Sequence, residues 1–112
     1  MTKVCINIPT AWPVRHDTEL RLRILRKGGI RCTKHELVVN LISPYERVPY
    51  IPESWNWHRI QERNMFLAHV EAVRLKLIPS DCDYAVFCDD DSLIDIDTMV
   101  DECNQKNSHS DA

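Results

Sequence analysis

The stretch of sequence that decides the fold reads Tyr-Ala-Val-Phe-Cys-Asp-Asp-Asp-Ser and spans residues 84–92. Apolar and aromatic side chains lead directly into three consecutive carboxylates. A run of this kind, rich in Val, Phe and Tyr, is typical of a buried strand in an α/β sheet. Because ligands of such sheets collect outside the carboxyl ends of the strands, the acids at positions 89–91 are predicted to lie at a ligand-binding edge.

The three acids themselves suggest a cation. Adjacent carboxylates repel one another unless a cation neutralises them or one of them takes a proton. Their hard oxygens suit Mg²⁺ or Mn²⁺, and Mg²⁺ sites commonly use one or two carboxylates together with substrate phosphates. Alternation along an extended segment would place Asp89 and Asp91 on the same side. The alternative is a solvated acidic turn whose aspartates favour the start of the next helix.

Length and composition describe an ordinary globular chain. Its 112 residues fit one small domain, which we expect to span residues 1–105 and to be followed by a polar, disordered tail over 106–112. A net charge of −3 provides no electrostatic attraction to nucleic acid or to an anionic membrane surface. The five cysteines form no C-x-x-C pair, and no signal peptide or membrane-spanning segment is evident, so reduced thiols and a cytoplasmic location are expected.

Strands and helices are predicted to alternate. Strands are expected over residues 3–8, 37–42 and 83–88, although a capping box makes a short helix near 33–42 the alternative to the second strand. Prolines interrupt the region 44–57, which holds at most a short edge strand at 48–51. This order favours an α/β layer with at least partly parallel strands. In such a sheet we expect Asp89 at the carboxyl edge of a central strand, on the same edge as Thr10.

Three helices are predicted between the strands. The first begins near Asp17 and ends at the glycines 28–29, and a short last helix over 98–103 is capped by Asp97. The second covers about 58–77. Its apolar stripe is expected to comprise Phe66, Val70, Val73 and Leu77.

Two groups of conspicuous side chains have ordinary explanations. Trp55 and Trp57 are expected to cover the core rather than to stack on a ligand, although Trp12 and these two residues offer aromatic surfaces. The basic residues of the first helix, Arg21 among them, are expected to be solvated. The histidines show no metal-binding spacing, so we assign them no role.

Three segments together carry a resemblance to a known family. They are Ile-Asn-Ile-Pro-Thr at 6–10, Glu-Arg-Asn at 62–64 and Val-Phe-Cys-Asp-Asp-Asp at 86–91. In this order and spacing the chain resembles the N-terminal, nucleotide-binding half of family-2-type glycosyltransferases with the GT-A fold. The three segments are similar to that family's opening strand with its Pro-Thr turn, its Arg-Asn pair and its D-x-D motif. The resemblance implies a Rossmann-like, mostly parallel GT-A sheet with helices on both faces, truncated after the D-x-D strand and one helix.

The resemblance also implies a set of site residues. The substrate is a nucleotide-diphosphate sugar, with a UDP-sugar favoured, and the cofactor is Mn²⁺ or Mg²⁺. Asp91 is the direct metal ligand, Asp89 holds the ribose or a metal-bound water, and Asp90 has a secondary role. Asp89 and Asp91 are thus the two residues expected at the metal. The residues expected to contact the donor are Pro9, Thr10, Arg63, Asn64, Asp89 and Asp90. The alternative for Arg63 is a surface salt bridge, and Asn64 has a local hydrogen bond as its alternative.

The chain departs from the family pattern in two places. Family members usually place an aspartate after the second strand to recognise the base, and in residues 40–46 only Glu46 is acidic. The acceptor site and the catalytic base are expected in a half of the fold that would follow the acid motif. We therefore expect a fragment, a minimal donor-binding domain, or a chain that needs a partner subunit or a second copy; the acceptor and the catalytic residues are not identified.

Two other functions remain open. One is a nucleotide-sugar- or metal-binding module without turnover. The other is a phosphatase of the haloacid dehalogenase type, which uses D-x-D-x-[TV] with the first aspartate as nucleophile. Residues 89–93 nearly fit that pattern, but Leu93 stands where Thr or Val is needed.

Overall fold

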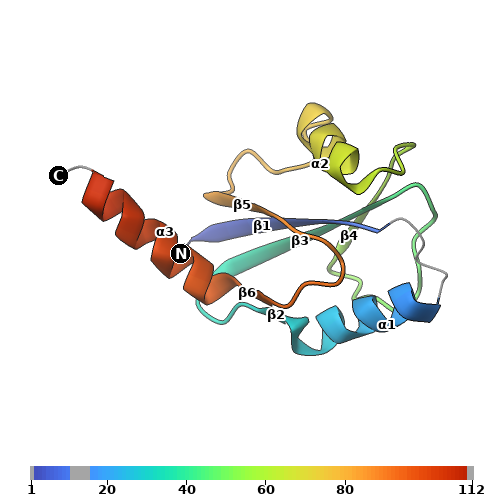
Figure 1. The fold of residues 1–112 in the computed structure, drawn as a ribbon, viewed down its shortest axis with the longest axis horizontal. Coiled ribbons are helices and arrows are strands. Elements are labelled where there is room, and N and C mark those ends of the chain that lie inside the picture. The colour runs from blue at the N-terminus through green and yellow to red at the C-terminus, as the bar shows by residue number, and fades with distance from the viewer. Residues whose placement is uncertain (1, 11–15, 111–112) are drawn as a thin grey trace.

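A computed structural model of the chain describes residues 2–10 and 16–110 (Figure 1). Trp12, named above as a possible stacking surface, lies outside these residues. The elements in chain order are β1 (Lys3–Pro9), α1 (His16–Ile24), the π-helical turn η1 (Leu25–Gly29), β2 (Ile30–Arg31), β3 (Glu36–Ser43), β4 (Asn56–Arg59), α2 (Met65–Arg74), β5 (Tyr84–Phe87), β6 (Ile94–Asp95) and α3 (Ile96–Ser110).

The main sheet is parallel throughout its four strands. Their order is β4-β3-β1-β5, so β1 lies between β3 and β5, while β2 and β6 form a small separate parallel pair. The three predicted strands correspond to β1, β3 and β5, and the mixed α/β architecture is confirmed. The helical alternative for β3 is wrong.

The position of β5 differs from the prediction. We expected Asp89 to follow a central strand, but within the described residues β5 pairs with β1 only and forms an edge of the sheet. Ala85 and Phe87 are exposed, Phe87 by 45%. An apolar run signals a strand but does not show whether neighbours flank it on both sides, which is why the sequence did not reveal the edge.

Helices cover both faces of the sheet, as predicted, with α1 on one side and α2 on the other (Figure 1). On the α1 side, alternate residues of β1 and β3 pack against the helix and form the main core. Ile6, Ile8, Leu22 and Leu41 are its fully buried centre. Trp55 and Trp57 are partly buried against this core, as the sequence predicts.

The face beneath α2 is more polar. Asn40 of β3 is buried there, and its amide nitrogen donates to the Leu77 carbonyl at 3.0 Å. Its amide oxygen accepts from the Asn56 amide at 3.0 Å and lies 3.2 Å from the Nε2 of His58. These contacts satisfy the buried amide of Asn40, which lies beside a second buried amide, Asn7 of β1. Burial lowers the pKa of His58, which favours the neutral ring in this network.

The buried side of α2 is not the predicted one, although Leu77, which follows the helix, does pack against the buried cluster as predicted. Ala68 and Ala72 pack against Ile42 and Ile60, whereas Phe66 is 73% exposed and Val73 57% exposed. Val70 is exposed as well. The two sets are both spaced for one helix face, so periodicity alone does not choose between them. Small alanines let the helix approach the sheet closely, and the larger side chains then point outward.

Several boundaries also differ from those predicted. Residues 56–59 form β4 rather than the end of an irregular region and the start of a helix, because they pair with β3, and 48–51 form no strand. The first helical segment ends as predicted at Gly28, whose φ of 132° lies in the left-handed region that favours glycine. At its start, Asp17 lies in the first turn of α1.

The last helix begins and ends at other positions than predicted. The carboxylate of Asp95, rather than that of Asp97, accepts from the backbone N–H of Thr98 at the start of α3. Asp97 instead accepts from the backbone and side chain of Thr33, which ties α3 to the loop before β3. The helix extends through residue 110 and so includes most of the segment predicted as a tail.

Across residues 2–10 and 16–110, no helix is long and apolar enough to span a membrane.

Candidate functional site

The carboxyl edge of the sheet joins two of the predicted motifs. Thr10 follows β1, where its backbone N–H donates to the Ile42 carbonyl at 2.8 Å. Its hydroxyl donates to the carboxylate of Asp90 at 3.0 Å. Both residues are buried. The contact links residues 80 positions apart in the sequence, and it confirms the prediction that the Pro-Thr turn and the acid motif share one edge.

Asp90 is the most strongly held of the three acids. Besides Thr10, the guanidinium of Arg21 on α1 lies 3.5 Å from its other carboxylate oxygen. Burial raises the pKa of the Asp90 carboxyl above its ordinary value, while the Thr10 hydrogen bond and the Arg21 charge oppose that rise. Asp90 is thus a fixed internal acid, whereas the resemblance gave it only a secondary role.

Asp89 and Asp91 flank this fixed residue, and both are exposed. The segment is a turn, with the backbone N–H of Ser92 directed at the Asp89 carbonyl at 3.4 Å. The expected alternation of an extended strand is therefore wrong here. Within the described residues, neither carboxylate forms an ion pair or accepts a hydrogen bond. Both remain open to a ligand from solvent.

The fit of this edge to a divalent cation depends on the donor set. Among the described residues, no three His, Cys, Asp or Glu side chains form a group able to hold a metal ion. Two carboxylates do provide the hard oxygens that Mg²⁺ and Mn²⁺ prefer, and Mg²⁺ usually takes its remaining ligands from water and phosphate. Two exposed carboxylates are fewer ligands than a metal site built from protein alone uses, so a cation at this edge would take most of its ligands from water and phosphate.

A second group of predicted residues lies next to Thr10. Pro9, Thr10 and Arg63 surround one packing gap together with Pro44 and Glu62, and this gap has no room for a water molecule. The guanidinium carbon of Arg63 lies 5.8 Å from the ring centre of Tyr45, within the range of a cation–π contact. The structure thus brings three residues from two predicted motifs to one place.

Asn64 has a local role in the structure. It is the N-cap of α2, and its side-chain oxygen accepts from the backbone N–H of Leu67 at 3.1 Å. A side chain of this type commonly caps a helix because it satisfies one of the first free N–H groups. This contact matches the local hydrogen bond that was the alternative to ligand binding.

Sequence reasoning missed two residues at this edge. Arg21 was expected to be solvated with the other basic residues of α1. Its guanidinium instead contacts Asp90 in the turn at residues 89–92, which we call the acid turn. His69 of α2 has a buried Nδ1 that finds no hydrogen-bond partner among the described residues, and its ring meets Phe87 edge to face with centres 5.3 Å apart. Burial lowers the pKa of His69, against the opposing charge of Asp89.

The signal for Arg21 was its place in the helix that follows β1, because the first turns of such a helix lie at the carboxyl edge of a parallel sheet. His69 carried no comparable signal. Its position follows from which face of α2 is buried, and that face was predicted wrongly.

Comparisons of the chain with protein-family models, with curated proteins and with solved structures find no match.

Proposed function

We propose that this chain is the donor-binding part of a glycosyltransferase of the GT-A kind. Its ligand is a nucleoside diphosphate sugar, with uridine as the favoured base, bound together with Mn²⁺ or Mg²⁺. The observation that carries the proposal is the hydrogen bond from the Thr10 hydroxyl to the Asp90 carboxylate at 3.0 Å. It unites the Pro-Thr turn and the acid motif, which the resemblance identified independently, at the edge where α/β sheets bind ligands.

The three acids at positions 89–91 have different roles in the proposed cation site. Asp90 holds the turn in place through its contacts with Thr10 and Arg21. The backbone that carries the exposed carboxylates of Asp89 and Asp91 is therefore fixed. Those two carboxylates would hold the cation together with water and the phosphates of the ligand. When bound, the cation stabilises the negative charge that grows on the departing diphosphate. A turn that is already fixed needs little reorganisation when the ligand arrives, which favours tight binding.

The nucleoside end of the donor extends toward Pro9, Thr10 and Arg63. Pro9 and Thr10 are buried beside a gap too small for a ligand, so the donor would meet this place through the exposed side chain of Arg63, which lies over the Tyr45 ring. A guanidinium provides several N–H donors in a planar fork, which suits either the carbonyls of a pyrimidine or the oxygens of a phosphate. Arg63 is thus the residue proposed to recognise the base or the diphosphate.

Binding of the donor, rather than transfer, is the activity proposed for this chain alone. Transfer requires donor and acceptor to be held in near-attack geometry, and much of its rate comes from that positioning. The edge described above supplies contacts for a donor. We therefore propose slow donor hydrolysis at most, with transfer requiring a partner subunit or a second copy.

Titration calorimetry of UDP with Mn²⁺ and with a chelator tests the proposal. A cation that bridges carboxylate and diphosphate couples the two binding events, so Mn²⁺ should raise the affinity for UDP by about tenfold or more. Asp91→Asn should abolish this gain. Asp101→Asn removes an exposed acid on α3 and should leave it unchanged.

Equal affinity for UDP in Mn²⁺ and in chelator would refute the proposal. Donor hydrolysis in the same samples would separate a transferase part from a binding module without turnover. Hydrolysis of a simple phosphate monoester would instead favour the phosphatase alternative.

A further inference from the structure

The outer edge of β5 is an incomplete part of the sheet. Within the described residues, β5 pairs with β1 on one side only. In a parallel pair, alternate residues direct their N–H and C=O groups away from the neighbour. An exposed edge of this kind offers a ready template for another extended chain.

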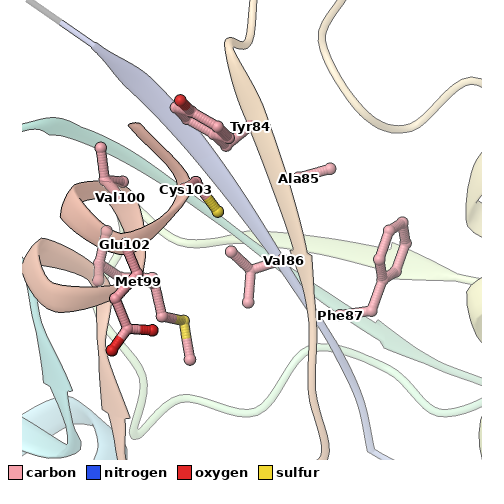
Figure 2. Close-up of a pocket in the computed structure, with 9 residues that line it drawn as sticks. Tyr84, Ala85, Val86, Phe87, Met99, Val100, Glu102 and Cys103 are labelled. Atoms are coloured by element: carbon pink, nitrogen blue, oxygen red, sulfur yellow. The ribbon is translucent and has the colours of Figure 1, made fainter. Parts of the chain in front are cut away.

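Side chains on both faces of β5 would support such an added strand. Figure 2 shows Tyr84 and Val86 pointing toward α3, whereas Ala85 and Phe87 point to the opposite side. A groove of about 330 Å³ lies between β5 and α3, and its lining includes Val86, Met99, Val100 and Cys103. Beyond the other face, Phe87 and the exposed side of α2 form part of an apolar groove of about 600 Å³. A strand that alternates apolar side chains would place them in the two grooves in turn.

The acidic residues around β5 indicate which kind of added strand would bind at its outer edge. Residues 77–105, which include β5, the acid turn and most of α3, carry nine Asp or Glu and no Lys or Arg. Asp83 precedes β5 and Asp89 follows it, and Glu102 lines the groove beside α3. No ion pair joins Glu102 to a described residue. A strand with basic ends would therefore meet acids along the whole edge, which steers binding and fixes the register.

We propose that the outer edge of β5 binds an extended polypeptide segment with alternating apolar side chains and Lys or Arg at its ends. The segment adds a fifth strand to the main sheet through main-chain hydrogen bonds. Its apolar side chains enter the grooves beside α3 and α2, and its basic ends lie near Asp83 and Glu102. This proposal concerns the sheet edge and stands independently of nucleotide binding.

A panel of synthetic peptides tests the proposal by fluorescence anisotropy. The first peptide is a ten-residue segment of alternating Val and Thr with two Lys at each end. The second has the same sequence with N-methyl groups on alternate residues, so that it cannot form the main-chain hydrogen bonds. The third replaces every Lys by Glu. The first should bind, and the other two should bind at least tenfold more weakly.

Charge reversal in the protein provides the matched test. The double variant Asp83→Lys and Glu102→Lys should weaken binding of the Lys-flanked peptide and strengthen binding of the Glu-flanked one. Glu53→Lys reverses an exposed acid before β4 and should change neither. The variants change exposed side chains, so thermal unfolding should confirm that they fold.

Two outcomes would overturn the proposal. Equal binding of the N-methylated and unmodified peptides would show that the main chain of β5 takes no part. A concentration-dependent dimer in sedimentation, together with no peptide binding, would show that a second copy of the chain occupies the edge instead.

Discussion

Both ends of β5 carry acidic residues, but these residues have different partners at the two ends. At the amino end, the ammonium group of Lys3 lies 2.7 Å from the Asp81 carboxylate, and the backbone N–H of Lys3 donates to Asp83 at 2.8 Å. At the carboxyl end, Thr10 and Arg21 hold Asp90, and its two neighbours remain exposed. At the first end the chain's own cation pairs with Asp81, whereas the second end leaves the carboxylates of Asp89 and Asp91 open to a ligand.

The partners of each acid thus indicate whether it contributes to the stability of the fold or to the binding of a ligand. The Lys3 hydrogen bond lowers the pKa of Asp81, as expected for a carboxylate held by its own cation. Burial raises the pKa of Asp90, which makes its ionised form costly unless Thr10 and Arg21 remain in place. Residue type alone does not distinguish these roles. Their partners do.

The largest expected effect comes from breaking the support of the acid turn. Asp90→Ala should lower the free energy of unfolding by about 1–3 kcal/mol, because the buried Thr10 hydroxyl and Arg21 lose their acceptor. Denaturant unfolding measures this change. Asp89→Ala is the matched control, since the neighbouring acid is exposed, and it should cost less than about 0.5 kcal/mol. Equal losses in the two variants would show that the Thr10 contact does not support the turn.

A smaller effect is expected in the acid stability of the protein. Hydrogen bonds from Thr33 lower the pKa of Asp97, so the stability that this group contributes is present above pH 4 and is lost as pH falls through its folded pKa. Asp90, whose pKa is raised, contributes in the opposite direction, because the folded state takes up its proton first. Thermal unfolding between pH 2 and pH 6 should therefore show a shallower pH dependence in Asp97→Asn and a steeper one in Asp90→Asn. The opposite order would contradict these assignments.

The smallest effect is expected at the amino end of β5. Lys3→Met removes the cation that Asp81 contacts, yet this pair is at the surface, where ion pairs contribute little. The melting temperature should fall slightly at low salt and hardly at all in 1 M NaCl, because salt screens the pair. The affinity for UDP should stay unchanged. A loss of UDP binding in this variant would mean that the two ends of β5 are not independent.

The sequence predicted the parts of the fold that depend on apolar runs and on turn residues. The strands around Ile6, Val39 and Val86 were predicted from such runs, and the shared edge followed from parallel pairing. It did not predict β4, because Asn-Trp-His-Arg has no apolar alternation and is held by pairing with β3. The buried side of α2 was missed because Ala68 and Ala72 have the same helical spacing as the larger exposed residues.

At the site, sequence reasoning identified the residue types but not their roles. Asp89 and Asp91 were placed on one side of an extended segment, while Asp90 was thought secondary. The turn at residues 89–92 reverses that picture, because it buries Asp90 against Thr10. Long-range contacts of this kind depend on how the whole sheet assembles, so local patterns in the sequence do not contain them.

Residue-by-residue detection of Mn²⁺ by NMR tests the central contrast most directly. The unpaired electrons of Mn²⁺ broaden the amide signals of nearby residues, so a small amount of the ion added to the isotope-labelled chain with UDP reports where it binds. The account predicts that the signals of residues 89–92 and of Thr10 broaden first, while those of Asp81 and Asp83 stay sharp. Broadening at the amino end of β5 to the same extent, or no selective broadening at all, would contradict the account.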